Sequence, residues 1–195
     1  MDADFQEKKI GSDNSVLYPV FMNLRGRRCV LVGAGEVASR KARRLLQAQA
    51  EVVVVAPEIS PDLEGVAHEV HRRPYRPGDL EGAFMAFAAT GSREVNEAVV
   101  REGRRLGVPV NVADDPDGGD FALPSVLRRG RLQVAVSTGG ASPALAREIR
   151  LRLERLFGPE WAGIVEELWR ARRDGRAPEG RLEEEVSRCL SRLRA

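Results

Sequence analysis

The sequence predicts a doubly wound α/β fold with a Rossmann-type parallel sheet, followed by a short connecting segment and a helical C-terminal tail. Short apolar runs alternate with amphipathic segments, and a glycine-rich turn joins the first run to the first amphipathic segment. This alternation stops after Asp120. Strands that alternate with helices at short intervals need parallel crossovers, which place helices on both faces of an open sheet.

The first strand-helix-strand unit is the most regular part of this pattern. Arg28–Val32 is typical of a buried strand, residues 36–48 of an amphipathic helix, and residues 51–55 of a second strand. The helix is expected to turn three apolar residues toward the sheet: Val37, Leu45 and Leu46.

The following units are less regular. A third strand is expected near residues 68–72, and the small-residue run 83–89 is expected to form a fourth. Ser92 is the expected N-cap of a helix that stops before Gly107, and residues 108–112 are expected to make a fifth strand.

The remainder of the chain changes in character. Leu132–Val136 is one more expected strand, and a helix is expected over 144–156, with Ser142 as N-cap and Pro143 in its first turn. Beyond it the sequence is helical in pattern. The sequence therefore predicts three segments, which cover residues 1–121, 122–150 and 151–195.

Composition excludes several classes of protein. The 195 residues are 43% hydrophobic, and 31 basic residues against 29 acidic ones give a net charge of +2. A nucleic-acid binder needs a concentrated basic face, so this balance argues against one. The mixed charges of the first residues and the lack of a long apolar run predict no secretory signal and no membrane span, and hence a cytoplasmic protein. Cys29 and Cys189 have no partners at metal-ligand spacing, so no metal site is predicted.

The strongest local signal is a glycine motif of the dinucleotide-binding type. Gly33, Gly35 and Ala38 form G-x-G-x-x-A between the first strand and the first helix. Gly33 permits a tight turn, Gly35 lets the backbone approach a pyrophosphate, and the helix N-terminus attracts phosphate charge. The acidic residue expected near the end of the second strand is Glu58, and no arginine follows it directly, which favours NAD over NADP. A glycine turn without a nucleotide is the alternative.

Polar residues follow several of the expected strands. Gly33 follows the first strand, Thr90 the fourth and Asp114 the fifth. The carboxyl ends of parallel strands lie along one edge of an open sheet, where ligands bind. Asp114 is therefore a candidate catalytic residue beside the cofactor. An ordinary acidic turn over residues 114–120 is the competing interpretation, because Asp, Pro and Gly are the usual turn formers.

A second glycine-containing segment, residues 137–143, precedes the helix expected over 144–156. Backbone amides of Gly139 and Gly140 at the start of a helix make it a candidate site for a carboxylate. The alternative is a well-capped helix with a flexible approach. Five arginines near this segment are expected to form a solvated basic face: Arg128, Arg129, Arg131, Arg147 and Arg150.

Several motifs occur in one order and spacing. They are residues 18–24 (YPVFMNL), 33–41 (GAGEVASRK), 54–58, 89–90, 111–114, 121–125 and 137–150 (STGGASPALAREIR). This series resembles precorrin-2 dehydrogenase, the family that includes the N-terminal module of bacterial sirohaem synthase and the yeast bifunctional dehydrogenase and ferrochelatase. The resemblance runs from about residue 17 to 157.

The resemblance implies NAD-dependent oxidation of precorrin-2 to sirohydrochlorin, on the branch to sirohaem or cobalamin. Some members also insert Fe²⁺, and the sequence leaves this second activity open. The resemblance further implies a homodimer held by residues 122–150, which become a dimerisation segment after an NAD-binding domain over 1–121. The active cleft is implied to lie between these two parts, and residues 151–195 form the helical C-terminal domain.

The expected site residues follow from the motifs and the resemblance together. The expected catalytic residue is Asp114. The expected cofactor-binding residues are Gly33, Gly35, Glu36, Val37, Pro57, Glu58 and Thr90. The expected substrate-binding residues are Thr138, Gly139, Gly140 and Ser142.

Two other functions stay open at this point. A non-enzymatic NAD-sensing or regulatory domain would keep the Gly33 turn but would need neither an acidic strand tip nor the 137–143 segment, so the presence of both counts against it. The second alternative, another small Rossmann dehydrogenase that acts on a hydroxy acid, would normally show a Lys, His or Tyr placed as a proton shuttle. Here Lys41 lies inside the first helix, and neither histidine follows a strand tip.

Overall fold

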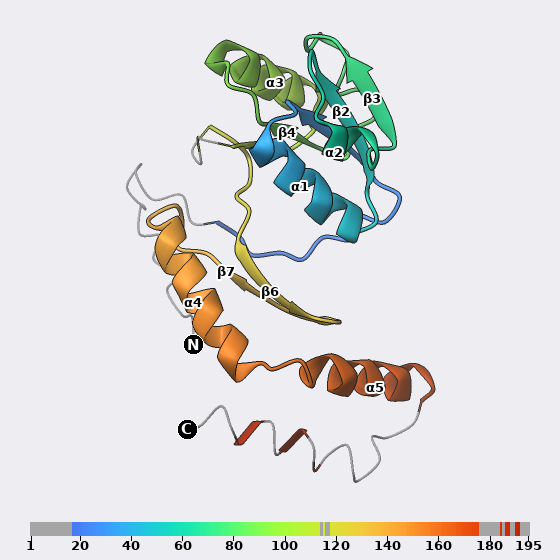
Figure 1. The fold of residues 1–195 in the computed structure, drawn as a ribbon, viewed down its shortest axis with the longest axis vertical. Helices are drawn as coiled ribbons and strands as arrows, with labels where there is room; N and C mark the ends of the chain where they lie inside the picture. The colour runs from blue at the N-terminus through green and yellow to red at the C-terminus, as the bar shows by residue number, and fades with distance from the viewer. Residues whose placement is uncertain are drawn as a thin grey trace, which may run out of the picture. The chain divides into compact units, whose positions relative to one another are not determined.

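The computed structural model describes residues 17–113, 115, 118–175, 184, 186, 187, 190 and 191. The chain divides into two units, with the division after Ala122 (Figure 1). Each unit has its own sheet and its own helices, and each is described by itself.

The first unit is built on a parallel sheet. Within the described residues, its five strands lie in the order β3-β2-β1-β4-β5, and every neighbouring pair is parallel. The strands are Arg28–Val32 (β1), Glu51–Ala56 (β2), Glu69–Arg72 (β3), Met85–Ala88 (β4) and Val110–Val112 (β5). The doubly wound parallel sheet predicted from the sequence is confirmed.

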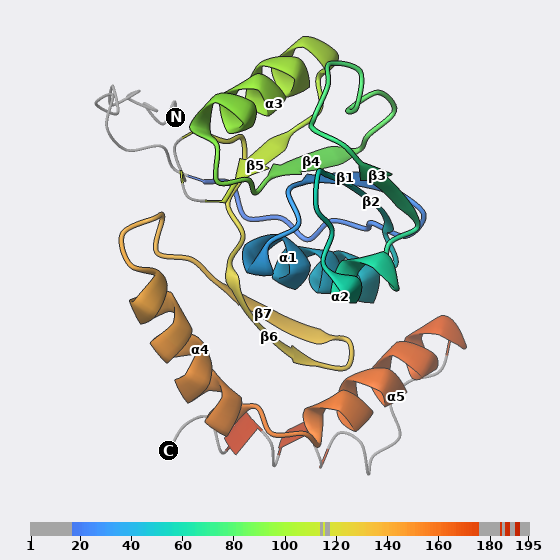
Figure 2. The ribbon, with the colours of Figure 1, turned by 45° about the horizontal axis from the view of Figure 1, so that its top comes forward.

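Helices cover both faces of this sheet. The helix α3 (Arg93–Leu106) lies on one face, and α1 (Glu36–Gln47) lies on the other with the short α2 (Pro61–Glu64) (Figure 2). Alternate side chains of a strand point to opposite faces. Val30 and Val110 accordingly belong to the apolar layer under α3, whereas Leu31 and Phe87 belong to the layer under α1. The sequence did not predict α2, because one helical turn is too short to produce a periodic signal.

The buried face of α1 differs from the expected one. Ala38, Ser39, Ala42 and Leu45 are buried, whereas Val37 and Leu46 are only half-buried, and of the three expected residues only Leu45 is fully covered. Small residues on this face allow close approach of the helix to the sheet. The prediction followed the large apolar side chains, but close packing selects the small ones.

The strand β5 begins two residues later than expected. Val108 donates its N–H to the carbonyl of Gly103 near the end of α3, at 2.9 Å, so it belongs to the turn that leaves the helix. Pro109 has no N–H to give to a sheet and contributes only its carbonyl, which accepts from Ala86 at 2.9 Å. The ladder with β4 therefore begins at Val110.

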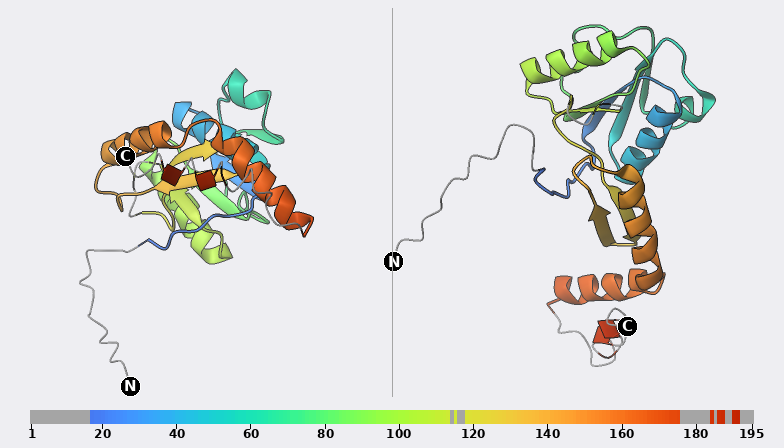
Figure 3. Two further views of the ribbon diagram at one scale, coloured as in Figure 1. Left: turned by 90° about the horizontal axis from the view of Figure 1, so that it is seen from below. Right: turned by 90° about the vertical axis from the view of Figure 1, so that its left-hand side faces the viewer.

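The second unit contains an antiparallel hairpin and two helices. The hairpin strands are β6 (Ser125–Arg129) and β7 (Leu132–Val136), with Gly130 at a φ of 56° in the turn. The helix α4 (Pro143–Leu156) runs beside the hairpin, and α5 (Trp161–Arg173) follows it (Figure 3). The strand β6 was not predicted from the sequence, because its last two residues, Arg128 and Arg129, were interpreted as part of a basic face.

The prediction of a solvated basic face is only partly correct. Arg129 donates from Nε to the carbonyl of Phe157 at 2.9 Å, so its guanidinium satisfies backbone at the C-terminal end of α4. Arg150 pairs with Glu154, and its side chain is only 18% exposed. The expectation of solvation is wrong for these two arginines, because Arg129 joins the hairpin to the end of α4 and Arg150 is paired within α4.

Candidate functional site at the carboxyl edge of the sheet

The turn after β1 tolerates no side chain. Gly33 has a φ of 110°, and a Cβ atom there would lie 2.3 Å from the carbonyl oxygen of Ala89, at the end of β4. Its N–H donates to the carbonyl of Val55 in β2 at 2.9 Å. Gly33 thus lies where the ends of β2, β1 and β4 meet. Only a glycine fits this tight turn, as the G-x-G-x-x-A motif predicts.

The N-terminus of α1 is open. Gly35 is the N-cap in an extended conformation, and the first helical bond runs from the N–H of Ser39 to the carbonyl of Gly35 at 2.9 Å. The N–H groups of Glu36 and Val37 precede this bond and have no acceptor within the helix. No atom of the described residues outside the immediate chain lies within 4 Å of a Cβ position on Gly35. This end of α1 can therefore receive a phosphate, which the helix dipole favours.

Two of the other described helices begin with a side-chain cap, whereas α2 and α5, like α1, have none. In α3 the hydroxyl of Ser92 accepts the N–H of Val95 at 3.3 Å, and in α4 the hydroxyl of Ser142 accepts the N–H of Leu145 at 3.1 Å. A glycine cap offers no such acceptor. The donors at the start of α1 are left for an external anion, and the residues present fit a dinucleotide pyrophosphate.

The end of β2 supplies an exposed carboxylate. Pro57 and Glu58 follow β2 directly, and both are exposed. β1 and β2 are in register from Arg28 with Glu51 to Val32 with Val55, so their carboxyl ends are adjacent. Glu58 is thus on the same edge of the sheet as the open end of α1, where a carboxylate can accept from ribose hydroxyls.

Thr90 is engaged inside the turn that follows β4. Its hydroxyl donates to Oδ1 of Asn96 at 2.7 Å and accepts the N–H of Ser92 at 3.1 Å. Asn96 is buried and returns a hydrogen bond from Nδ2 to the carbonyl of Thr90 at 3.2 Å. These bonds fix the wall next to Gly33, so Thr90 can serve the cofactor site by shaping it as well as by contact.

Asp114 lies outside the described residues, but the base of its loop is described. Ala113 donates its N–H to the carbonyl of Ala88 at 2.9 Å, and Asp120 donates its own N–H to the carbonyl of Val110 at 2.7 Å. A carboxylate oxygen of Asp120 also accepts the N–H of Val110 at 2.8 Å. Both ends of the segment are therefore held on β5 and β4.

Two linked hydrogen bonds near the base of this loop were not predicted from the sequence. Lys41 donates from Nζ to Oδ1 of Asn111 at 2.7 Å, and Asn111 donates from Nδ2 to the carbonyl of Phe121 at 2.8 Å. Lys41 lies three positions after Ala38 and four before Leu45, so helical spacing places it on the sheet side of α1. That spacing was the signal that could have identified it.

The segment 137–143 is closed by its own hydrogen bonds. The hydroxyl of Thr138 accepts the N–H of Ser142 at 3.0 Å, and Gly139 donates its N–H to the hydroxyl of Ser137 at 3.1 Å. Gly139 and Gly140 both have positive φ, at 59° and 87°. The amide of Gly139 is thus used within the turn, whereas Thr138 and Ser142 build the start of α4.

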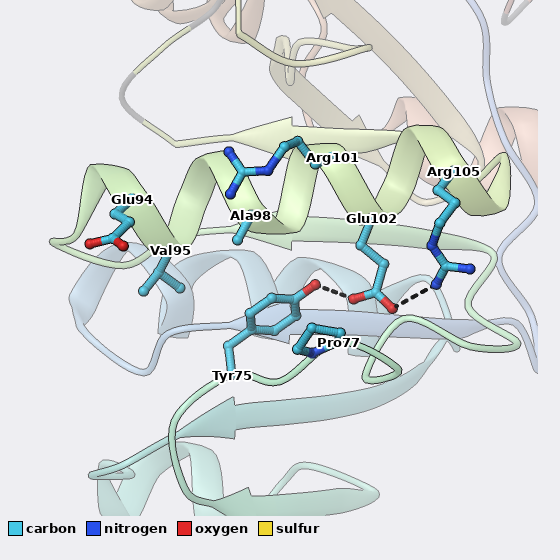
Figure 4. Close-up of a pocket in the computed structure, with 8 residues that line it drawn as sticks. All are labelled: Tyr75, Pro77, Glu94, Val95, Ala98, Arg101, Glu102 and Arg105. Carbon is cyan, nitrogen blue, oxygen red and sulfur yellow. Dashed lines mark hydrogen bonds and ion pairs between the residues drawn. The ribbon is translucent and has the colours of Figure 1, made fainter.

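A groove of about 550 Å³ lies elsewhere, between α3 and the chain after β3 (Figure 4). At its base the buried carboxylate of Glu102 accepts from the hydroxyl of Tyr75 and from the N–H of Gly78, the latter at 2.6 Å. Burial and the neighbouring carboxylate raise the pKa of Tyr75 well above its ordinary value. None of the predicted site residues lines this groove, and its polar groups hold the loop after β3 on α3.

Comparisons with known proteins address the family directly. Residues 20–125, more than half of the chain, match the family model described as putative NAD(P)-binding. The chain belongs to this NAD(P)-binding family. Residues 129–156 match a second model, described as sirohaem biosynthesis protein central. The nicotinamide cofactor expected from the glycine motif is thereby confirmed.

The curated relatives of this NAD(P)-binding chain include sirohaem synthases, whose N-terminal module the motifs resemble. It is 48% identical to the sirohaem synthase of Chromobacterium violaceum over 144 residues, which are 72% of this chain and 31% of that protein. It is 44% identical to the sirohaem synthase of Nitrosomonas eutropha over 145 residues, 72% of this chain and 30% of that protein. The chain therefore spans about a third of the length of these curated relatives.

A solved structure resembles the chain over nearly its whole length. SirC, a precorrin-2 dehydrogenase, superposes with a TM-score of 0.71 and 29% sequence identity, and the match covers 91% of this chain and 92% of that chain. The resemblance to the precorrin-2 dehydrogenase family indicated by the motifs is confirmed.

Among the described helices, none is both long and apolar enough to cross a membrane.

Proposed function

We propose that the chain oxidises precorrin-2 to sirohydrochlorin with NAD⁺. The observation that carries this proposal is the shared edge of the sheet, where the uncapped start of α1, the exposed Glu58 and the base of the Asp114 loop all lie. Similarity to a precorrin-2 dehydrogenase over 91% of the chain supports the choice of substrate. NAD⁺, when bound, supplies the hydride acceptor.

The cofactor is held by backbone and by one carboxylate. The N–H groups of Glu36 and Val37 would donate to the pyrophosphate, and Gly33 and Gly35 would keep side chains out of its way. Pro57 and Glu58 would contact the adenosine end, and the Glu58 carboxylate would accept from the ribose hydroxyls. The same carboxylate would repel a 2′-phosphate, so NAD is favoured over NADP.

Asp114 takes the proton. Formation of the new double bond removes a hydride, for which bound NAD⁺ would be the acceptor, and a proton from the substrate. A carboxylate after a strand tip is suited to accept that proton. The carboxylate groups of the substrate are bound by the turn at residues 137–143, where Gly140 contributes a backbone amide and Thr138 and Ser142 fix the turn. The negative charge of the substrate is also matched by exposed arginines such as Arg147.

We propose a cytoplasmic homodimer, with residues 122–150 as the dimerisation segment. Two observations within the second unit support the dimer. β6 and β7 pair only with each other among the described strands, so the outer edge of each strand presents backbone groups that could pair with a second copy. Leu145, Ile149 and Leu156 are exposed at helical spacing on α4, which is suited to burial against a second copy.

Anaerobic incubation of the purified chain with enzymatically prepared precorrin-2 tests the function. With NAD⁺ we expect the visible spectrum of sirohydrochlorin to appear, with slower conversion when NADP⁺ is used. A chain that binds NAD⁺ but leaves precorrin-2 unchanged would be an NAD-sensing domain instead. Fe²⁺ added to the completed reaction determines whether the chain also accelerates metal insertion, relative to sirohydrochlorin alone.

A further inference from the structure

The two linked hydrogen bonds that start at Lys41 connect α1 with β5, the two elements that lead to the candidate cofactor and catalytic residues. Lys41 is on α1, six residues after Gly35 at the open N-terminus of that helix. Its partner Asn111 is in the middle of β5, three residues before Asp114. The Nζ–Oδ1 distance is 2.7 Å, and Nζ also lies 5.7 Å from the ring centre of Phe87 in β4.

The amide of Asn111 is oriented by both of its partners. Lys41 can only donate, so it selects the Oδ1 side of the amide, and this leaves Nδ2 to donate to the carbonyl of Phe121 at 2.8 Å. Asn111 is only 5% exposed, so an unpaired amide there would be costly. Removal of the lysine donor would leave Oδ1 of Asn111 without this partner.

Phe121 is the point at which the loop returns to the sheet. Its ring packs edge-on against Phe87, with ring centres 5.6 Å apart. The preceding residue, Asp120, is bonded to Val110, and a Cβ atom on Gly119 would lie 2.8 Å from the carbonyl of Val110. The return of the loop is therefore packed without spare room, and its position depends on the neighbouring strand and on Asn111.

We propose that Lys41 is a positioning residue, which acts through Asn111 and Phe121 to hold the described return of the loop after β5, residues 118–121, against the sheet. Asp114 belongs to the same loop by its place in the sequence. This inference rests on the proposed function for its catalytic consequence. The geometry of the two hydrogen bonds, from Lys41 to Asn111 and from Asn111 to Phe121, is independent of that function. In this role the ammonium group of Lys41 serves as a hydrogen-bond donor to Asn111.

Three variants of the 195-residue chain separate the links. Lys41→Met keeps most of the side-chain length but removes the donor, and Lys41→Arg keeps a cationic donor. Asn111→Asp keeps an acceptor for Lys41 and removes the donor to Phe121. Arg43→Met is the matched control, because Arg43 is two positions along the same helix and makes a comparable 3.0 Å ion pair, with Asp62, at an exposed position.

Two readouts are needed. Amide hydrogen exchange of residues 111–121 is measured on each purified variant without substrate, and kcat, KM for precorrin-2 and the Kd for NAD⁺ are measured separately. We expect Lys41→Met and Asn111→Asp to exchange at least tenfold faster in this segment and to lose at least tenfold in kcat. The Kd for NAD⁺ should stay within about twofold, Lys41→Arg should recover part of the loss, and Arg43→Met should match the unmodified chain.

The outcomes distinguish this inference from the proposed function. If exchange in residues 111–121 is unchanged in both Lys41→Met and Asn111→Asp, the positioning role is wrong whatever the activity. If exchange increases but kcat stays within twofold, the bonds are structural only and the inference is again overturned. If the unmodified chain itself makes no sirohydrochlorin, the proposed function fails, and the catalytic part of the inference fails with it.

Discussion

A Cβ atom on Gly33 would stand 2.3 Å from the carbonyl oxygen of Ala89. The turn that leaves β1 is therefore in direct contact with the end of β4, and the two cannot move apart to admit a side chain without opening the sheet. The cofactor turn and the next strand tip form one rigid wall. The second glycine of the motif, Gly35, faces open space instead.

This contrast predicts different outcomes for two alanine substitutions. Gly33→Ala should lower the free energy of unfolding by at least about 2 kcal/mol, because a positive φ and a backbone clash are combined. Gly35→Ala should leave stability nearly unchanged but raise the Kd for NAD⁺ at least about tenfold, because the methyl group occupies the approach of the pyrophosphate. Urea denaturation and calorimetric titration measure the two effects. Equal behaviour of the two variants would contradict the division of roles.

Replacement of Asp114 should separate binding from chemistry. In Asp114→Ala we expect the Kd for NAD⁺ to be unchanged and kcat for precorrin-2 oxidation to fall by about 10² to 10⁴, the range typical of a lost general base. Asp115→Ala, at the next position, is the matched control and should retain activity. An Asp114→Ala variant that oxidises precorrin-2 at the unmodified rate would rule out the catalytic assignment.

Substitutions in the turn before α4 should change both the stability of the fold and the KM for precorrin-2. Ser142→Ala removes the cap that accepts the N–H of Leu145 and should cost about 1 kcal/mol of unfolding free energy. Thr138→Val removes the hydroxyl that binds Ser142 and should raise KM for precorrin-2 while the Kd for NAD⁺ stays constant. Ser92→Ala removes an equivalent cap from α3 and provides the comparison. A KM for Thr138→Val equal to that of the unmodified chain would argue against the substrate role of this turn.

Acid should destabilise the first unit through Asp79. Burial alone would raise the pKa of this carboxyl, but hydrogen bonds from Arg73 and from the backbone N–H of Arg76 hold it below its ordinary value of 3.8. A carboxyl with a lower pKa in the folded state stabilises the fold above its unfolded pKa, and this stabilisation is lost as pH falls below that value. Asp79→Asn should therefore be less stable at neutral pH and should depend less on pH below about 4. Urea titrations between pH 2 and pH 7 give both slopes, and identical slopes would be inconsistent with this role of Asp79.

Glu58 should govern the choice between the two nicotinamide dinucleotides. Glu58→Gln removes the negative charge and retains an acceptor, so we expect the preference for NAD⁺ over NADP⁺ to fall by about tenfold, a charge contribution of roughly 1.4 kcal/mol. Glu51→Gln, an exposed position at the opposite end of the same strand, serves as the control. The ratio of kcat/KM values for the two cofactors measures the effect.

The sequence was sufficient for the sheet and for the cofactor turn because both depend on local signals. A glycine between a β-branched run and an amphipathic helix has few structural solutions, and Gly33 occupies the expected one. The loop after β5 depends instead on contacts distant in sequence, such as Lys41 with Asn111, which no local pattern encodes. The hairpin strand β6 was missed for a related reason. Arg129 is a charged residue that suggests solvent exposure, yet its guanidinium donates to the carbonyl of Phe157 at the end of α4.

The central claim is that one edge of the sheet binds NAD⁺ and directs hydride from precorrin-2 to it. The most direct test is an anaerobic single-turnover reaction in which NADH and sirohydrochlorin are quantified in the same sample. We predict one NADH for each sirohydrochlorin, with both products lost together in Asp114→Ala. Sirohydrochlorin formed without NADH, or bound NAD⁺ that stays oxidised beside unreacted precorrin-2, would contradict the account.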